Sequence, residues 1–169
     1  MNGEAPRVRV YFAAPLFNPV ERAFNEDMAR RLQPVADVFL PQRDGALLTK
    51  LVAGGQSVHL ARRKIFNSDT GAINDCHAVV AVLDGRTIDE GVAFELGYAT
   101  ALGKVCIGYK SDDRVMLPTG DNPMISVACQ YSCSSLDALV EAVKAIGSSI
   151  CNSISILDFE RGARTDYPI

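Results

Sequence analysis

The chain has 169 residues, 48% of them hydrophobic, and a formal net charge of −3. This length and apolar content suit one globular domain, which we expect to span residues 1–169. The acidic balance argues against nucleic acid or an anionic membrane as a partner, because both require clustered Lys and Arg. No apolar run approaches the roughly 20 residues that cross a bilayer, and the N-terminus lacks a signal-peptide pattern, so we expect a cytoplasmic location.

Cysteine and histidine usage gives no sign of a metal centre or of a disulfide framework. The five cysteines are odd in number, and several lie in or beside apolar segments, which favours reduced thiols. Neither His59 nor His77 lies at a recognisable zinc-ligand spacing from a Cys, Asp or Glu, so we predict no metal. The sequence also lacks a Walker motif and a Gly-x-Gly-x-x-Gly fingerprint, and we therefore expect no bound cofactor.

The chain begins with the pattern strand, loop, helix, strand. Residues 7–13 are rich in Val, Tyr and Phe and predict a buried strand. Asn18 can cap a helix that has Pro19 in its first position and an apolar face reaching Leu32. The short apolar run at 35–40 then predicts a second strand.

The rest of the chain continues this alternation. Short apolar runs are separated by segments in which apolar residues recur with helical spacing. In chain order, we predict a polar loop at 42–45, helices at 46–52 and 57–74, a strand at 78–83, a helix at 91–101, a strand at 104–109, a loop at 111–123, a strand at 127–131 and a helix at 136–146. Residues 148–169 follow as a C-terminal extension, either flexible or clasping another subunit.

Strands that alternate with helices and are apolar throughout predict an α/β fold with a mostly parallel sheet covered on both faces. We expect a three-layer open sandwich with a central five-stranded sheet, of the flavodoxin or Rossmann-like type. Ligands of such sheets bind outside the carboxyl ends of the strands. The loops that follow strands here are 14–17, 42–45, 84–91 and 110–124, and the polar and unusual residues collect in them.

Glu95 is the residue that a simple helix pattern explains least. Its neighbours at i−3, i+1 and i+4 are Val92, Leu96 and Ala99, so its carboxylate lies among apolar side chains. Burying a lone carboxylate costs more than a domain's stability margin can absorb, and Glu95 must therefore be hydrogen-bonded or charge-compensated. Glu90, in the same segment, instead fits a solvent-exposed helix face.

Two further acids, Asp69 and Asp89, can converge with Glu95 at the same edge of the sheet. Carboxylates grouped in one pocket suit glycosyl chemistry. An acid near a helix N-terminus is kept ionised and can act as nucleophile, while a neighbour crowded by like charge keeps its proton and serves as general acid. The alternative is structural: Asp89 is then a solvated turn residue, and Asp69 caps a helical turn.

Three segments of the sequence resemble nucleoside 2-deoxyribosyltransferases. They are residues 11–17 (Tyr-Phe-Ala-Ala-Pro-Leu-Phe), 75–83, and 89–98 with its Glu-Leu-Gly-Tyr core. The resemblance runs in order through Asn-Pro-Met at 122–124 and covers most of the chain. Related N-glycoside hydrolases acting on deoxynucleoside monophosphates share the Glu-Leu-Gly-Tyr core, whereas the first-strand motif and the Asn-x-Met triplet favour the transferase.

The resemblance implies a catalytic role for four residues. Glu95 matches the nucleophile that attacks C1′ of deoxyribose and displaces the base. Asp69 and Asp89 match the acidic pair that holds the sugar and moves a proton to and from the base. Tyr11 matches the tyrosine whose hydroxyl orients the nucleophilic carboxylate.

Five other residues are candidate substrate contacts. Phe17 matches an aromatic wall over the nucleoside. Asn122 and Met124 match residues that reach into the pocket of an adjacent subunit and contact the 5′ end of the sugar, which implies a homo-oligomer. Gln42 and Asp44 lie where a base-reading loop is expected, although a polar turn after a proline also explains them.

We therefore predict a nucleoside deoxyribosyltransferase, which moves 2-deoxyribose from a deoxynucleoside to another nucleobase through a covalent Glu95 intermediate. Its expected role is nucleoside salvage. The small side chains of Ala13 and Ala14 favour purines. Two alternatives stay open. One is an N-glycoside hydrolase of deoxynucleosides or their 5′-monophosphates. The first loop, Ala13-Ala14-Pro15, counts against the monophosphates, because it lacks the glycines with which backbone N–H groups bind a phosphate. The other is a non-catalytic nucleotide-binding module.

Overall fold

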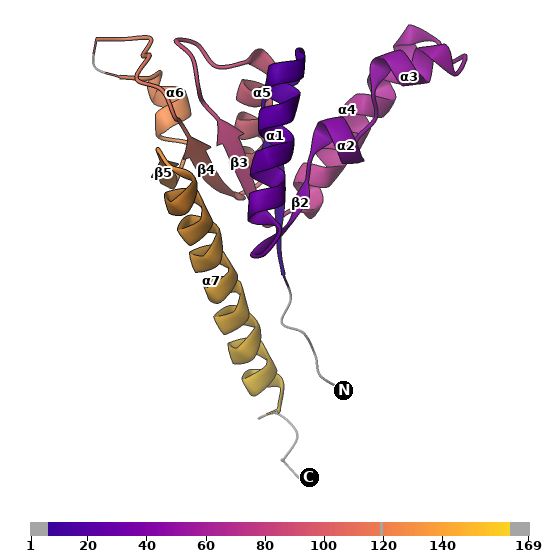
Figure 1. Ribbon diagram of the computed structural model, residues 1–169. Coiled ribbons are helices and arrows are strands. Elements are labelled where there is room, and N and C mark those ends of the chain that lie inside the picture. Colours follow the sequence, from indigo (N-terminus) through magenta and orange to yellow (C-terminus); the bar gives the residue numbers. More distant parts are fainter. Residues whose placement is uncertain (1–6, 119, 163–169) are drawn as a thin grey trace.

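The computed structural model describes residues 7–118 and 120–162, with residues 151–162 described by their backbone alone. Its centre is a five-stranded sheet in the order β2-β1-β3-β4-β5, and every neighbouring pair of strands is parallel. Helices lie on both sides of this sheet (Figure 1). The predicted three-layer α/β sandwich of flavodoxin-like type is therefore confirmed.

Strands and helices alternate along most of the chain. The strands are β1 (Val8–Ala13), β2 (Ala36–Phe39), β3 (Ala78–Val82), β4 (Val105–Tyr109) and β5 (Tyr131–Cys133). The helices are α1 (Pro19–Leu32), α2 (Pro41–Asp44), α3 (Leu48–Ala53), α4 (Val58–Asp75), α5 (Glu90–Ala101), α6 (Pro123–Ser126) and α7 (Leu136–Gly162). Within the described ranges, no helix is long and apolar enough to cross a membrane.

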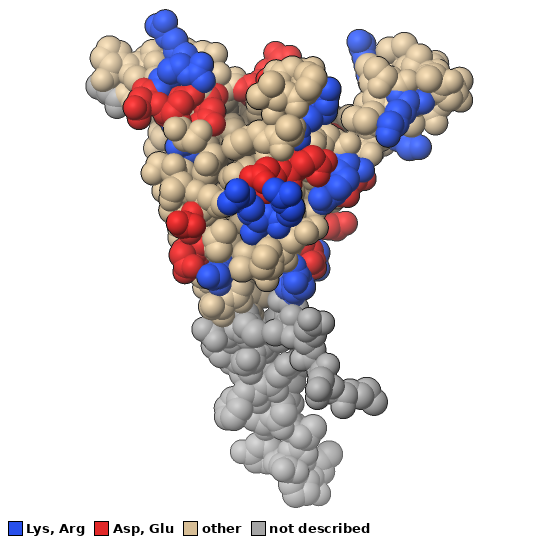
Figure 2. Space-filling model, viewed as in Figure 1, with Lys and Arg blue, Asp and Glu red and all other residues tan. Residues whose placement is uncertain are grey.

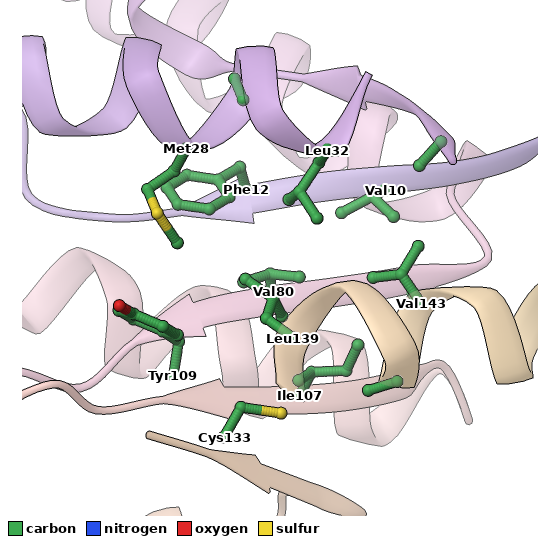
Figure 3. Packing of buried hydrophobic residues seen from close by; sticks show 14 of the residues in the cluster. Val10, Phe12, Met28, Leu32, Val80, Ile107, Tyr109, Cys133, Leu139 and Val143 are labelled. Atoms are coloured by element: carbon green, nitrogen blue, oxygen red, sulfur yellow. The ribbon is translucent and has the colours of Figure 1, made fainter. Parts of the chain in front are cut away.

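Each face of the sheet has its own apolar core, because alternate residues of a strand point to opposite sides. Val10 and Phe12 of β1 face α1 and α7, where they pack with Leu32 and Leu139 (Figure 3). Tyr11, between them in sequence, faces α4 and α5. All five residues of β3 are buried, which explains why this strand reads as an uninterrupted apolar run.

The helix after β1 begins with a capping box. The Asn18 side chain accepts hydrogen bonds from the backbone N–H groups of Val20 and Glu21, at 2.9 and 3.0 Å. The Glu21 carboxylate in turn accepts from the backbone N–H groups of Phe17 and Asn18, at 2.7 and 3.2 Å. These bonds satisfy donors that the first turn leaves unpaired, and they fix the loop between β1 and α1.

Three predicted elements differ from the structure. Residues 42–45 were expected as a loop, but Pro41–Asp44 form the short helix α2, in which the Asp44 carboxylate accepts from the Leu40 N–H at 2.8 Å. The last strand lies at Tyr131–Cys133 and not at 127–131. Helix α7 continues far past residue 146, and the Ser148 and Ser149 hydroxyls within it donate to carbonyls one turn back, both at 3.1 Å.

Helix α3 and the first half of α4 project from the sheet as an arm (Figure 1). No residue of α3 is buried, and the arm exposes apolar side chains: Leu48, Val52, Val58, Leu60 and Phe66. Residues 45–68 contain four Lys or Arg and no acidic residue, and Figure 2 shows blue side chains on an otherwise tan arm. The arm is therefore a basic and partly apolar surface.

Candidate active site

Tyr11 of the sheet and Glu95 of α5 meet at the interface between the sheet and that helix. Tyr11 of β1 is fully buried, and its ring stacks on Phe39 of β2 with centroids 5.6 Å apart. This stacking fixes the ring, and the hydroxyl donates a hydrogen bond to Glu95 Oε1 at 2.5 Å. The compensating partner that the sequence requires for Glu95 is thus the hydroxyl of Tyr11.

Helix α5 carries Glu95 in its second turn and begins at a capping aspartate. The Asp89 side chain accepts hydrogen bonds from the N–H groups of Gly91 and Val92, at 2.9 and 3.2 Å. Asp89 is therefore an N-cap and not a freely solvated turn residue. Val92, Leu96 and Ala99 are buried around Glu95 as predicted, and Glu90 is exposed.

Asp69 lies on α4 and faces the same region. Its Oδ1 atom is buried and has no hydrogen-bond partner among the described residues. The backbone of Gly45 approaches it closely, since a methyl group built on Gly45 would lie 3.1 Å from Asp69 Oδ1. A buried carboxylate oxygen without a partner is suited to receive a donor from a ligand.

Burial shifts the pKa values of these groups. It raises the pKa of Glu95 to about 7; the hydrogen bond from Tyr11 opposes this rise, and the charges of Asp69 and Asp89 add to it. Burial also raises the pKa of Asp69 to about 6. The pKa of Tyr11 is raised by its burial and by Glu95, so its hydroxyl stays a neutral donor.

The helix dipole alone would predict a fully ionised Glu95, but the Glu95 carboxyl group is only partly ionised near neutral pH. The sequence predicts that the N-terminus of α5 keeps Glu95 ionised, whereas burial and two acidic neighbours raise its pKa. Near neutral pH the Glu95 carboxyl group exists in both its protonated and ionised forms. A carboxyl group with both forms available can act as a nucleophile when ionised and can transfer a proton when protonated.

A pocket of about 250 Å³ lies between α4 and α5 and contains both Glu95 and Asp69. Its lining combines the two acids with apolar, aromatic and small side chains: Arg62, Ile65, Phe66, Asp69, Thr70, Ile73, Gly91, Phe94 and Glu95. A larger hollow of about 650 Å³ runs between β2 and α4. Its arginines are already engaged, because Arg43 pairs with Asp44 and Arg9 donates to the Asp75 carbonyl. The smaller pocket is the one that holds two of the predicted catalytic acids.

Sequence reasoning missed three residues of this pocket. Arg62, in the short basic run Arg62-Arg63-Lys64, lines the pocket. Phe66 and Phe94 also line it, and their ring centroids are 5.8 Å apart. A signal was present for two of them, because Arg62 and Phe66 precede Asp69 by seven and three residues and so share its face of α4.

Of the nine predicted site residues, Asp69 and Glu95 line this pocket, Tyr11 and Asp89 interact with Glu95 from beside it, and the other five lie elsewhere in the described chain. Phe17 and Met124 are 75% and 79% exposed, and the Asn122 side chain caps α6 by accepting from the Met124 N–H at 3.0 Å. Gln42 donates to the Arg22 carbonyl and to Glu26, at 2.9 and 3.1 Å, and thus ties α2 to α1. Asp44 binds the Leu40 N–H and Arg43. One chain thus brings together Tyr11, Asp69, Asp89 and Glu95.

The part of the chain that the structure describes holds no group of three or more His, Cys, Asp or Glu side chains placed to bind a metal ion. Its reactive groups are two carboxyls with raised pKa values and a neutral tyrosine hydroxyl. Acids grouped at the carboxyl edge of a parallel α/β sheet are an arrangement that glycosyl chemistry uses.

The family to which the chain belongs follows from a comparison with protein-family models. The model of nucleoside 2-deoxyribosyltransferase matches residues 10–155. This range includes every acid of the site and the whole sheet except the start of β1. The chain is a member of the nucleoside 2-deoxyribosyltransferase family.

Solved structures support the same fold. A conserved protein of Enterococcus faecalis V583 is 25% identical, with a TM-score of 0.67 over 83% of this chain and 99% of that one. A 2-deoxyribosyltransferase of Bacillus psychrosaccharolyticus is 21% identical, with a TM-score of 0.64 over 79% of this chain and 90% of that one. No curated protein matches the sequence significantly.

Proposed function

We propose that this protein transfers 2-deoxyribose from a deoxynucleoside to another nucleobase, with Glu95 as the nucleophile. The observation that carries the proposal is the hydrogen bond from Tyr11 to Glu95 Oε1 in a pocket that also holds Asp69. Membership of the nucleoside 2-deoxyribosyltransferase family supports the substrate class. A general protein-binding role would not require two carboxyls with raised pKa values facing one small pocket.

The proposed reaction has two displacements at C1′ of the sugar. In the first, ionised Glu95 forms a bond to C1′ while the bond from C1′ to the base nitrogen breaks. Asp69, in its protonated form, supplies the proton that the leaving base requires, and burial makes this form more accessible than for an exposed aspartate. In the second, a nitrogen of the incoming base attacks C1′, Glu95 leaves as a carboxylate, and the proton released by the base returns to Asp69.

The 2-deoxy sugar is the favoured substrate on chemical grounds. The C1′–N bond breaks through an oxocarbenium-like state, and a 2′-hydroxyl would withdraw electrons from it. Capture of the sugar by a base, and not by water, requires that the occupied pocket excludes water. Phe66 and Phe94 border the pocket as apolar surfaces on which a base can stack. Purines are the proposed bases, in a salvage role.

The proposed site is completed by a second subunit. Asn122 and Met124 are exposed and do not line the pocket of their own chain in the described structure. In the proposed homo-oligomer they enter the pocket of a neighbour and contact the 5′ end of the sugar. The exposed phenylalanines beside the pocket are apolar surface that a neighbouring subunit would cover.

Incubation with deoxyinosine and free adenine tests the proposal. The parent protein is expected to form deoxyadenosine and hypoxanthine in equal amounts, and Glu95→Ala to form neither. Release of hypoxanthine without deoxyadenosine would identify an N-glycoside hydrolase. If parent and Glu95→Ala both bind deoxyinosine and neither changes it, the protein is a non-catalytic binding module. A panel of four acceptor bases then measures the preference for purines.

A further inference from the structure

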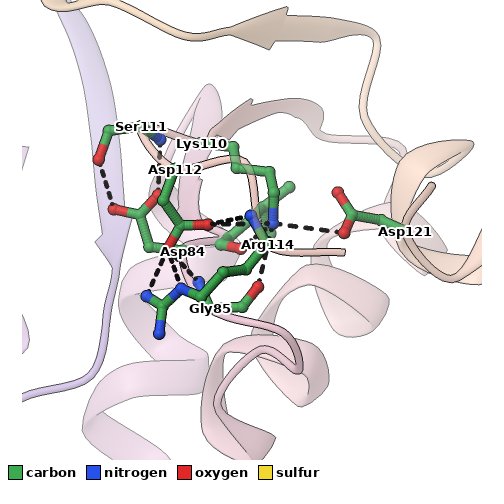
Figure 4. A network of polar contacts seen from close by, with 8 residues as sticks. Asp84, Gly85, Lys110, Ser111, Asp112, Arg114 and Asp121 are labelled. Atoms are coloured by element: carbon green, nitrogen blue, oxygen red, sulfur yellow. Dashed lines mark hydrogen bonds and ion pairs between the residues drawn. The ribbon is translucent and has the colours of Figure 1, made fainter. Parts of the chain in front are cut away.

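One lysine at the carboxyl edge of the sheet binds two loops at once. Lys110 follows β4, and its ammonium group donates to the carbonyls of Leu83 and Gly85 after β3, both at 3.1 Å (Figure 4). The same group pairs with Asp121 at 3.3 Å and with Asp112 at 3.8 Å. Only 16% of the Lys110 side chain is exposed. Its charge is thus largely shielded from water and held among four oxygen atoms.

Further bonds join the same two loops. Asp112 accepts a hydrogen bond from the Gly85 N–H at 2.8 Å and also pairs with Arg114. Asp84 accepts from the backbone N–H and from the hydroxyl of Ser111, at 2.5 and 2.8 Å. Figure 4 shows these contacts arranged around the Lys110 ammonium. The loops after β3 and β4 are therefore a single bonded unit.

In the proposed homo-oligomer the two loops lead to two different pockets, that of their own chain and that of a neighbour. The loop after β3 continues to Asp89, which caps the helix that carries Glu95. The loop after β4 continues to Asp121, directly before Asn122, whose side chain caps α6. Lys110 touches both loops, so it connects the start of the helix that carries Glu95 to the segment proposed to contact the sugar in a neighbour's pocket.

We propose that Lys110 is a positioning residue that fixes residues 121–124 relative to the N-terminus of α5. Lysine suits this role because its three N–H donors can serve two carbonyls and a carboxylate together. An apolar replacement would leave the Leu83 and Gly85 carbonyls and the Asp121 carboxylate without this donor. The catalytic consequence of this role, but not the role itself, rests on the proposed deoxyribosyl transfer.

Hydrogen exchange tests the positioning role without any substrate. Lys110→Met keeps the length of the side chain and removes the charge. We expect exchange at Ile125 and Ser126, whose N–H groups bond to the Asn122 carbonyl, to accelerate roughly 10-fold. Lys144→Met is the matched control, because Lys144 is exposed on α7 and pairs with Glu141. Asp121→Ala removes the ion pair with Lys110 and is measured if Lys110→Met does not fold. Unchanged exchange in α6 in the folded variants would overturn the proposal.

Measurements of kcat/KM then distinguish a positioning role of Lys110 from a general effect on the stability of the fold. Asn122 is proposed to contact the 5′ end of the sugar, so the ratio of kcat/KM for 2′-deoxyinosine over 2′,5′-dideoxyinosine measures that contact. We expect Lys110→Met to reduce this ratio about 10-fold and Lys110→Arg to restore part of it. An equal loss with both substrates would overturn the positioning role. If the parent protein cleaves neither substrate, the proposed function fails, while the exchange measurement still decides the role of Lys110.

Discussion

Glu95 is subject to two opposing effects at one position. Burial and the charges of Asp69 and Asp89 favour its protonated form, whereas the hydrogen bond from Tyr11 favours the carboxylate. The resulting pKa of about 7 keeps an ionised fraction available near neutral pH. Tyr11 therefore increases the ionised fraction of Glu95, the form that the proposed reaction requires.

Tyr11→Phe removes the hydroxyl and leaves a ring that can still stack on Phe39. Because the lost hydrogen bond lowers the pKa of Glu95, that pKa must rise, and the acidic limb of the pH profile must move to higher pH. At pH 7 we expect kcat/KM for deoxyinosine to fall roughly 10- to 100-fold. The pH dependence of kcat/KM checks this, with Tm as the control for folding. A limb that stays in place while activity falls would contradict it.

Glu95→Gln is expected to stabilise the fold at high pH. The pKa of Glu95 is raised from 4.5 to about 7, so between these values the folded state binds a proton that the unfolded state has released. The free energy of unfolding must therefore decrease as pH rises through this window. A shift of this size corresponds to at most ~3 kcal/mol, and we expect Glu95→Gln to recover about 1–3 kcal/mol at pH 8 and little at pH 4.

Urea unfolding of the parent protein and of Glu95→Gln at both pH values measures this difference. Asp69 also has a raised pKa, but it is present in both proteins and largely cancels. Glu141→Gln, on the exposed face of α7, is the control. An equal gain at pH 4 and pH 8 would show that the carboxylate is not the source of the effect.

At the scale of elements, the junction of α2 and α4 depends on a glycine. A methyl group at Gly45 would lie 2.5 Å from the Pro41 carbonyl oxygen and 3.1 Å from Asp69 Oδ1. The first contact cannot be relieved without moving the backbone of α2, and the second displaces an acid of the site. Gly45→Ala should therefore destabilise the protein by about 1–3 kcal/mol and reduce activity even where it is folded.

Gly97→Ala is the matched control for this substitution. Gly97 lies on α5, and an added methyl group meets no atom within 4 Å in the described structure. Alanine favours a helix by up to ~1 kcal/mol over glycine, so this variant should be at least as stable as the parent. Thermal unfolding and kcat/KM at 25 °C compare the two. Equal behaviour of the two alanine variants would refute a special role for Gly45.

The elements predicted correctly are those with local signals. The Asn18-Pro19-Glu21 pattern places the start of α1, and the uniformly apolar run of β3 reveals a strand buried on both faces. Helix α2 was missed because one turn of helix is held by tertiary contacts, such as those of Gln42 with α1. The position of β5 was missed because Val127, apolar in sequence, is 82% exposed.

The site was predictable only in part. Tyr11 and Glu95 are 84 residues apart, and no local spacing brings them together. The resemblance supplied their pairing, and the parallel order of β1 and β3 supplies its physical cause. Neither source shows that burial would raise the pKa of Glu95 to about 7, because burial depends on the packing of α4 against α5. For the same reason Phe94 was missed as a wall of the pocket.

At the scale of the whole molecule, the pocket and the residues proposed to close it are separated. Glu95 and Asp69 lie between α4 and α5, next to the arm formed by α3 and the first half of α4. Asn122 and Met124 lie on α6, beyond the other side of α5. The arm has basic residues and no acidic ones. In the loop before α6, Asp112 and Asp121 are already paired with Lys110 and Arg114. The separation within one chain is therefore the feature that favours a site shared between subunits.

Mixing two inactive variants tests whether subunits share a site. Glu95→Ala lacks the nucleophile and Asn122→Ala lacks the sugar contact, but in a mixed dimer one pocket receives Glu95 from one chain and Asn122 from the other. Random pairing makes half of the dimers mixed, each with one intact site of two, so we expect about a quarter of the parent activity after subunit exchange. Mixing Glu95→Ala with Asp69→Asn is the control. Both residues line the pocket of their own chain, so neither pocket of that mixed dimer is intact and activity must stay lost. Recovery in the control, or none in the first mixture, would place the complete site within a single chain.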